Sequence, residues 1–350
     1  MNNSQNQLST AITSLRFPLI FFVIMLHCYS VVYLEGVHPL YFGGIYPFAL
    51  WLGETGVPGF LFISGYLFFL SKKTYVRKLQ ARFHSLFIPY ILWNALLLTA
   101  YLVAYTAGHP QDINGKNMAD FNWMDYLRLF WDRGSFDNGN FVPLLCPYWY
   151  IRNLLILSLF SPLIFLVVRY LRELFILATA IWWILTPHNA FIPQSILFFS
   201  LGAYFSIHDK NPLTLFKRYQ TILIGSCILL ACADIITHTL FPTIINLQIH
   251  RLALIANIPA LFILANHFTS QGALSPITSY LSNAAFIVFS IHYPIVVVLR
   301  KCSIQYFANA NDYLHLLLYF GCIVIATLLS LLFYQLLPNR IKNILSGNRS

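Results

Sequence analysis

Arg16 and His27 are the two residues of this chain whose types and spacing most directly suggest chemistry, because both lie in the apolar run from Ile12 to Leu34. On an α-helix, their separation of eleven positions places both side chains within about 20° of one face and about 16 Å apart along the axis. An ionisable residue inside a membrane helix is expensive and usually functional. The pair predicts a stripe that lines a channel, in which Arg16 binds a phosphate-bearing donor and His27 carries out proton chemistry at the donor's far end.

Both residues also have structural interpretations. Arg16 lies near a helix end, where a cation often extends its head group to the membrane surface. A buried histidine with satisfied hydrogen bonds would explain His27 without any catalytic role. We favour the functional interpretation because the two residues share one stripe.

Three more ionisable residues, Glu54, Asp234 and His292, are expected at the depth of His27 in the outer half of the membrane. Two histidines and two carboxylates at one level favour a polar cavity. All four residues are therefore candidate catalytic residues.

Each of these three residues has a structural alternative. His292 precedes a Tyr-Pro pair and is equally suited to satisfy backbone groups that the proline frees. Asp234 is four residues before His238, a spacing that favours a local pair on one helix face. Glu54 lies between two glycines and is also suited to a helix interface.

Two arginines at helix ends are candidate binding residues. Arg82 begins the third apolar span on the expected cytoplasmic side, where one more positive-inside charge is the alternative interpretation. Arg152 lies one turn into the fourth span from the outside, behind Trp149. An arginine at that depth is costly, so it is expected to bind an anionic acceptor or a structural carboxylate.

The elements that position these residues are predicted to be membrane helices. The 350 residues are 58% hydrophobic and 9% charged, and the mean hydropathy is +0.68. Soluble domains contain roughly 25% charged residues, so a soluble protein is excluded, and no nucleic-acid partner is expected despite a net charge of +10. The six cysteines include no CxxC pair, and no ligand spacing indicates a metal.

The apolar runs predict an all-α, polytopic bundle of about ten transmembrane helices, in a single domain over residues 1–350. The expected spans are 12–34, 50–70, 84–106, 148–168, 172–187, 190–207, 219–240, 249–268, 276–299 and 313–337. The fifth and sixth are short and are joined by residues 186–189, so they are also suited to a re-entrant hairpin. Residues 1–10 carry no Lys or Arg, so no cleavable signal is expected.

Positive charges in short loops predict the orientation. The loops after the second, fourth and sixth spans and the C-terminal tail carry Lys72, Lys73, Arg77, Lys78, Arg82, Arg169, Arg172, Lys210, Lys217, Arg218, Arg340, Lys342 and Arg349. With ten spans all of them lie on one side, which predicts that both termini are cytoplasmic. The acidic loop from Ala107 to Pro147 would then lie outside, together with Arg300 and Lys301, which break the rule.

Several motifs occur in one order along nearly the whole chain. They are the Arg16-to-His27 spacing, VPGFLFISGYLFF (Val57 to Phe69), RFHSLFIPYILWN (Arg82 to Asn94), PYWYIRNLL (Pro147 to Leu155) and SYLSNAAFIVFSIHYPIVV (Ser279 to Val297). Together they resemble the acyltransferase-3 family of membrane proteins, the O-acetyltransferases of bacterial surface glycans. Ten helices is also that family's number. Where relatives often carry a second basic residue in the third motif, this chain has His84-Ser85.

The resemblance implies transfer of an acyl group, usually acetyl, from cytoplasmic acyl-CoA to a sugar hydroxyl. Arg16 and Arg82 would bind the phosphates of acetyl-CoA, and the pantetheine arm would bridge the ~16 Å to His27. His27 would act as general base or as a transient acyl carrier. No metal is implied.

The resemblance also implies an acceptor side. Glu54 or Asp234 would orient the His27 imidazole, and Arg152, Trp149 and His292 would face a glycan or lipid-linked sugar acceptor. The expected location is the bacterial inner membrane, among membrane lipids. An esterase-like domain of the kind attached to some relatives is not expected.

Three other functions fit parts of the pattern. A transporter or flippase for a glycan or lipid-linked substrate would also place a polar layer in the outer half of the membrane. A different class of membrane O-acyltransferase pairs a histidine with an asparagine, but Asn257 and Asn283 lack a matching context. A structural or receptor role is the third alternative.

Overall fold

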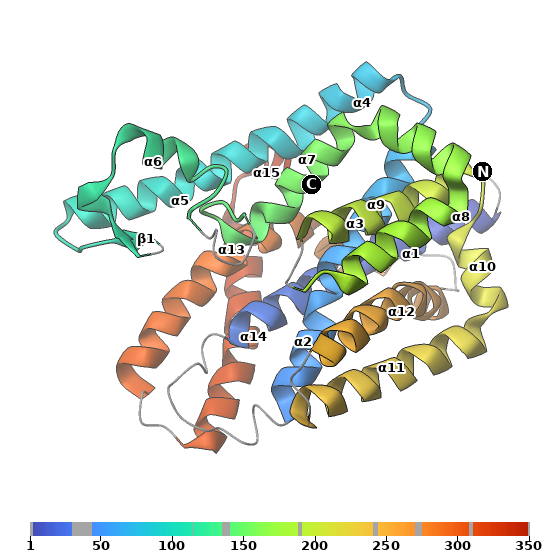
Figure 1. The fold of residues 1–350 in the computed structure, drawn as a ribbon. Helices are drawn as coiled ribbons and strands as arrows, with labels where there is room; N and C mark the ends of the chain where they lie inside the picture. The colour runs from blue at the N-terminus through green and yellow to red at the C-terminus, as the bar shows by residue number, and fades with distance from the viewer. Residues whose placement is uncertain are drawn as a thin grey trace.

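The computed structural model describes residues 3–29, 44–113, 115–134, 141–187, 191–240, 244–269, 275–307 and 311–348, and over these the chain is a bundle of helices (Figure 1). The α-helices are α1 (Asn3–Cys28), α2 (Tyr46–Glu54), α3 (Gly56–Leu70), α4 (Tyr75–Arg82), α5 (Ile88–Thr106), α6 (Trp123–Arg128), α7 (Trp149–Leu159), α8 (Ser161–Leu185), α9 (Phe191–Ile207), α10 (Pro212–Arg218), α11 (Gln220–Leu240), α12 (Ile244–Thr269), α13 (Pro276–Phe307), α14 (Asp312–Leu336) and α15 (Asn339–Ser346). The shorter elements are β1 (Asp112–Ile113), β2 (Lys116–Asn117), the π-helix η3 (Phe83–Phe87) and the 3₁₀ turns η4 (Met118–Asp120) and η6 (Cys146–Tyr148).

The arrangement of helices supports a polytopic helical membrane protein. Seven of the described helices are long and apolar enough to cross a membrane, and there are up to nine spans if each of two bent pairs is one span. The bent pairs are Cys146–Leu159 with Ser161–Leu185, at 73°, and Phe191–Ile207 with Pro212–Arg218, at 96°. The count of ten spans and the cytoplasmic location of both termini stay predictions.

Several predicted boundaries shift. Helix α1 begins at Asn3, well before residue 12, so its first turns are polar, and the hydroxyls of Thr10 and Thr13 bond to carbonyls one turn back. Leu34 lies outside the described residues. Helix α13 continues to Phe307, so Arg300 and Lys301 extend a helix and do not form a loop. The predicted boundary between the fourth and fifth spans coincides with a break inside α8, where Arg172 has φ 49° and ψ −126°. Of the predicted 186–189 connection, residues 188 and 189 lie outside the described residues.

Helix α1 lies at the centre of the bundle, where it packs against α2, α3, α12, α13 and α14. Two glycines allow α2 and α3 to approach it closely. A Cβ at Gly53 would lie 2.7 Å from the Cβ of Leu26, and a Cβ at Gly56 would lie 2.7 Å from the carbonyl oxygen of Leu19. The glycines that flank Glu54 are therefore interface residues, as one interpretation of the sequence expected.

Helices α3 and α9 form another close contact, also through glycines. A Cβ at Gly65 would lie 2.0 Å from the carbonyl oxygen of Phe199, and a Cβ at Gly202 would lie 2.0 Å from that of Phe62. Real side chains do not approach backbone this closely. The prediction that small residues in the second-span motif serve close helix packing is confirmed at Gly65.

The described part of residues 107–147, here called the lobe, folds beside the end of α5 (left in Figure 1). Its small core consists of Ile113, Met118, Leu129 and Leu144. The side chains of Asn122 and Asp125 form a capping box at the start of α6. Lys116 Nζ donates to Asp125 at 2.8 Å, and this bond, helped by the backbone N–H of Asn122, lowers the pKa of the Asp125 carboxyl.

Candidate active site

His27 lies in the last turn of α1 and lines a cavity of about 160 Å³, here called the histidine cavity. The imidazole is half-buried. Its ring centroid lies 5.5 Å from that of His292 and 5.1 Å from that of Tyr293, which meets it edge-on. The structure therefore brings together the two histidines that sequence depth placed at one level.

His292 is fully buried on α13 and is held in one orientation. Its Nδ1 lies 2.7 Å from the carbonyl oxygen of Phe289. Because a carbonyl only accepts, Nδ1 carries the proton, and in the neutral ring Nε2 is the unprotonated nitrogen. This Nε2 has no hydrogen-bond partner among the described residues. Pro294 has no N–H to donate to the carbonyl of Ser290, four residues earlier. His292 bonds to the carbonyl of Phe289 instead. The alternative in which His292 satisfies the backbone group freed by the proline is therefore not what the structure shows.

Arg133 and Tyr293 are neighbours of His27 that sequence reasoning missed. Arg133 belongs to the lobe, where its backbone N–H donates to Val142 at 2.8 Å. Its side chain hydrogen-bonds with Tyr293, close to Cys146. Arg133 lies in a loop without helical periodicity, so the sequence carried no signal that would place it at this depth.

Arg16 and Arg82 line one cavity of about 450 Å³, here called the arginine cavity. Its wall also includes the polar side chains Ser64, Ser85 and Asn283. Arg82 donates to the carbonyl of Ser64 at 3.4 Å and lies over the ring of Phe68 at 5.5 Å. The two arginines lie on different helices, α1 and α4, and are therefore brought to one space by packing.

The arginine and histidine cavities adjoin. Phe289 lines both of them, and Val57 and Phe60, one turn apart on α3, line one each. Arg16 and His27 thus face two neighbouring cavities along α1 that meet at Phe289, where the sequence predicted one channel.

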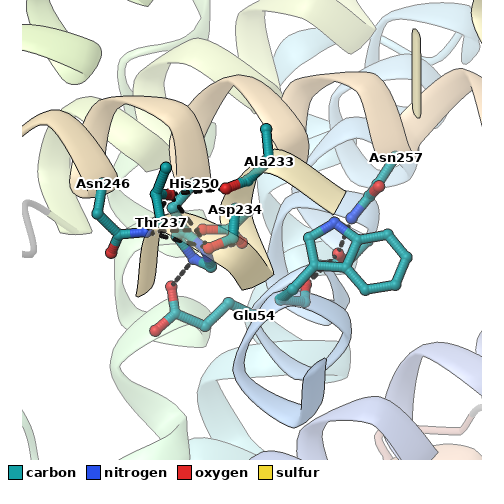
Figure 2. Close-up of polar contacts among 9 residues, drawn as sticks. Glu54, Ala233, Asp234, Thr237, Asn246, His250 and Asn257 are labelled. Atoms are coloured by element: carbon teal, nitrogen blue, oxygen red, sulfur yellow. Dashed lines mark hydrogen bonds and ion pairs between the residues drawn. The ribbon is translucent and has the colours of Figure 1, made fainter. Parts of the chain in front are cut away.

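Glu54 and Asp234 contact His250, where the sequence had offered His27 or His238 as partners (Figure 2). The Nδ1 of His250 lies 2.7 Å from Asp234 Oδ2, and its Nε2 lies 3.1 Å from Glu54 Oε2. The expected Asp234–His238 pair is therefore wrong, because α12 brings a histidine to Asp234 from outside its own helix. The ring of His238 instead lies 5.5 Å from that of Tyr46.

His250 and the adjacent Arg251 are further residues that sequence reasoning missed, although their position at the outer end of the predicted 249–268 span was a usable signal. Both line the histidine cavity. Arg251 is 2% exposed and donates to the carbonyls of Trp183, Ile184 and Thr186, the last at 2.5 Å. It therefore caps the C-terminus of α8, where a cation is electrostatically favoured.

Arg152 does not line the histidine cavity. It donates to the carbonyl oxygens of Trp131 at 2.5 Å and Phe141 at 2.9 Å, and it lies over the Trp131 ring at 4.9 Å. It also donates to Asn153 Oδ1 at 3.3 Å, and among the described residues no carboxylate forms a salt bridge with it, so the expected carboxylate partner is not found. Its role toward an anionic acceptor stays a prediction. It also lines a separate, mainly apolar cavity of about 490 Å³.

Trp149 does line the histidine cavity, as does Phe191, on which its indole stacks with ring centroids 3.8 Å apart. Within the described residues, no group of three or more His, Cys, Asp and Glu side chains is arranged to hold a metal ion. The cavity is thus bounded by aromatic faces and by paired ionisable groups.

Comparisons with known proteins agree with the motifs. A family model described as an acyltransferase domain matches residues 10–335. The succinoglycan biosynthesis protein ExoH of Rhizobium meliloti (strain 1021) is 29% identical over 171 residues, which cover 46% of this chain and 44% of that protein. The match thus spans less than half of that relative's length, and no solved structure matches the chain. Because the family model covers nearly the whole sequence, the chain belongs to the acyltransferase-3 family.

Proposed function

We propose that this protein is a membrane O-acyltransferase that moves an acyl group, acetyl in the first instance, from acyl-CoA to a hydroxyl of a cell-surface or lipid-linked glycan. Membership of the acyltransferase-3 family supports the reaction class, and the printed role of ExoH in succinoglycan biosynthesis supports a glycan acceptor. The observation that carries the proposal is the pair of adjoining cavities, one with two arginines and one with two neighbouring histidines.

The arginine cavity suits the donor. Guanidinium groups bind phosphates through charge-assisted, bidentate hydrogen bonds. Arg16 and Arg82 would hold the CoA phosphates, and the flexible pantetheine arm would pass Phe289 into the histidine cavity. The ~16 Å between Arg16 and His27 along α1 is a distance that this arm can bridge.

The histidine cavity suits proton transfer at the thioester. His27 would accept the proton of the acceptor hydroxyl as that oxygen attacks the thioester carbonyl. When the C–S bond breaks, the proton would pass from His27 to the departing thiolate. In a two-step variant, His27 would attack the thioester carbonyl and the C–S bond would break to release the CoA thiolate. The acceptor hydroxyl would then attack the acyl-imidazole, lose its proton and release His27. His292, with its unprotonated Nε2 close by, would serve as a second proton acceptor.

The direct test is mass spectrometry of surface polysaccharide from bacterial cells with and without the protein. The glycan is expected to gain a two-carbon acyl ester only when the protein is present. Purified protein with labelled acetyl-CoA should form the same ester in liposomes. If the liposomes instead move labelled glycan across the bilayer without forming an ester, the protein is a transporter or flippase and the proposal is wrong.

A further inference from the structure

His250 is held between two carboxylates, as Figure 2 shows. A neutral imidazole has one N–H, and a carboxylate only accepts, so both contacts are satisfied together when the ring carries both protons. Asp234 is 2% exposed and His250 6% exposed. Asn246 also binds Asp234, through Nδ2 to Oδ1 at 3.3 Å and to its carbonyl at 3.2 Å. The cluster is therefore fixed on the side away from the cavity.

Glu54 is the part of this cluster that reaches the histidine cavity. Its side chain is 27% exposed, and it lines the cavity that His27 also lines. One carboxylate oxygen bonds to His250, and the other points away from it in Figure 2. That second oxygen has no hydrogen-bond partner among the described residues. The cavity wall thus offers a fixed acceptor to a ligand that donates hydrogen bonds.

The charges of this wall balance within the protein. Two carboxylates, Glu54 and Asp234, face a protonated His250 and the guanidinium of Arg251. Arg251 donates to three carbonyls at the end of α8. Among the described residues around Glu54, the cations are thus already paired within the protein, and Arg133 lies at the His27 end of the cavity. A second negative charge beside the Glu54 carboxylate would be repelled.

Aromatic faces complete the cavity. Trp149, stacked on Phe191, and Trp183 line it, and so does the amide of Gln194. A pocket with apolar rings and a few fixed polar groups suits a ligand that has both an apolar face and hydrogen-bond donors. A pyranose ring has C–H faces and equatorial hydroxyls, and so combines these two properties. The cavity volume of about 160 Å³ equals roughly five waters of liquid volume, which is the scale of one sugar ring.

We propose that Glu54, with Trp149 and Gln194, forms an acceptor subsite for one uncharged sugar ring, and that His250 and Asp234 are positioning residues that fix the Glu54 carboxylate. The proposal rests on the proposed function, whose acceptor it narrows to a neutral sugar. A hydroxyl bound there would lie in the same cavity as His27.

The test is a binding measurement that does not depend on acyl transfer. Purified protein in lipid nanodiscs is titrated with methyl β-D-glucopyranoside and with its charged counterpart, methyl β-D-glucuronide, while tryptophan fluorescence is followed. The neutral glycoside is expected to bind at least about tenfold more tightly than the anionic one, since the Glu54 carboxylate would repel the uronate carboxylate. Trp149→Phe is expected to reduce the fluorescence change.

Three variants test the roles of the wall residues. Glu54→Gln removes the charge but keeps the shape, so the preference for the neutral glycoside is expected to fall about tenfold. His250→Gln is expected to weaken the same preference by releasing Glu54, and the donor KM is expected to stay unchanged. Glu173→Gln, a matched change at an exposed carboxylate on α8, is expected to leave the preference as it is.

Two results would overturn the proposal: no binding of the neutral glycoside, or a preference that is the same in Glu54→Gln and in the unchanged protein. The outcomes also separate the two proposals. Glycoside binding without any acyl transfer contradicts only the proposed function, whereas acyl transfer without a preference for the neutral sugar contradicts only the subsite.

Discussion

The arginine and histidine cavities meet at Phe289 but treat charge in opposite ways. In the arginine cavity, Arg16 and Arg82 face a space whose other polar lining residues are uncharged, such as Ser64 and Asn283. In the histidine cavity, the ionisable residues Glu54 and His250 are bonded to each other, and His250 also to a buried carboxylate. A surplus of cations suits a ligand that brings negative charge, and the paired charges around Glu54 suit a ligand group that brings none. Electrostatics would thus direct the donor and the acceptor to different cavities before the acyl group is transferred.

The largest effect is expected in the histidine cavity, when the proposed base is removed. His27→Ala is expected to lower the rate of glycan acetylation by about 10²-fold or more, the usual contribution of a general acid–base group. The measurement is the initial rate of ester formation from labelled acetyl-CoA, with equal amounts of inserted protein. His238→Ala is the matched control and is expected to keep its activity, because His238 lies beside Tyr46 on α11. Full activity of His27→Ala would contradict the proposed mechanism.

The second change tests the arginine cavity alone. Arg16→Gln and Arg82→Gln are each expected to raise the donor KM about tenfold, because each removes a charge-assisted bond to phosphate. Acetyl-pantetheine lacks the nucleotide phosphates, so its KM should not change in either variant. The acceptor KM should also stay constant. An equal rise in KM for both donors would show that the arginines act on something other than phosphate.

The third change perturbs both cavities together. Gly65→Ala would place a Cβ 2.0 Å from the carbonyl oxygen of Phe199, so it is expected to reduce stability by roughly 1–3 kcal/mol through overpacking. Because α3 lines both cavities, donor and acceptor KM should rise together. Thermal unfolding in detergent gives the stability. Gly225→Ala is the control, because its new Cβ meets nothing within 4 Å. A small gain in stability is expected there from the higher helix propensity of alanine.

The smallest effect is expected at α6 of the lobe, a helix that lines neither cavity. Asp125→Asn removes the carboxylate that binds Lys116, so hydrogen exchange in α6 should become slightly faster at neutral pH. The pKa of Asp125 is lowered in the folded protein, so its contribution is present above the unfolded value and is lost as pH falls through the folded value. The difference between the two proteins should therefore vanish in acid. A change in either KM would contradict the expectation that Asp125 acts only on the local stability of α6.

The membrane class, the family and the joint depth of His27 and His292 could be predicted from the sequence, because they depend on apolar length, on the order of the motifs and on each residue's position within its own span. Apolar length indicates a span, and a 3.6-residue period places side chains on a face. The partners of Asp234 could not be predicted in this way. His250 comes from another helix, and the only cue was its position at a span end.

The sequence by itself determined that the chain is a helical membrane protein of the acyltransferase-3 family, with a cation and an imidazole on its first long helix. Only the tertiary structure decided that Arg16 and Arg82 share a cavity, that Arg152 holds the lobe, and that Glu54 faces a ligand space while bonded to His250. The physical reason is that composition and period act locally, whereas a buried charge takes whichever partner the packing of distant helices brings within hydrogen-bond reach.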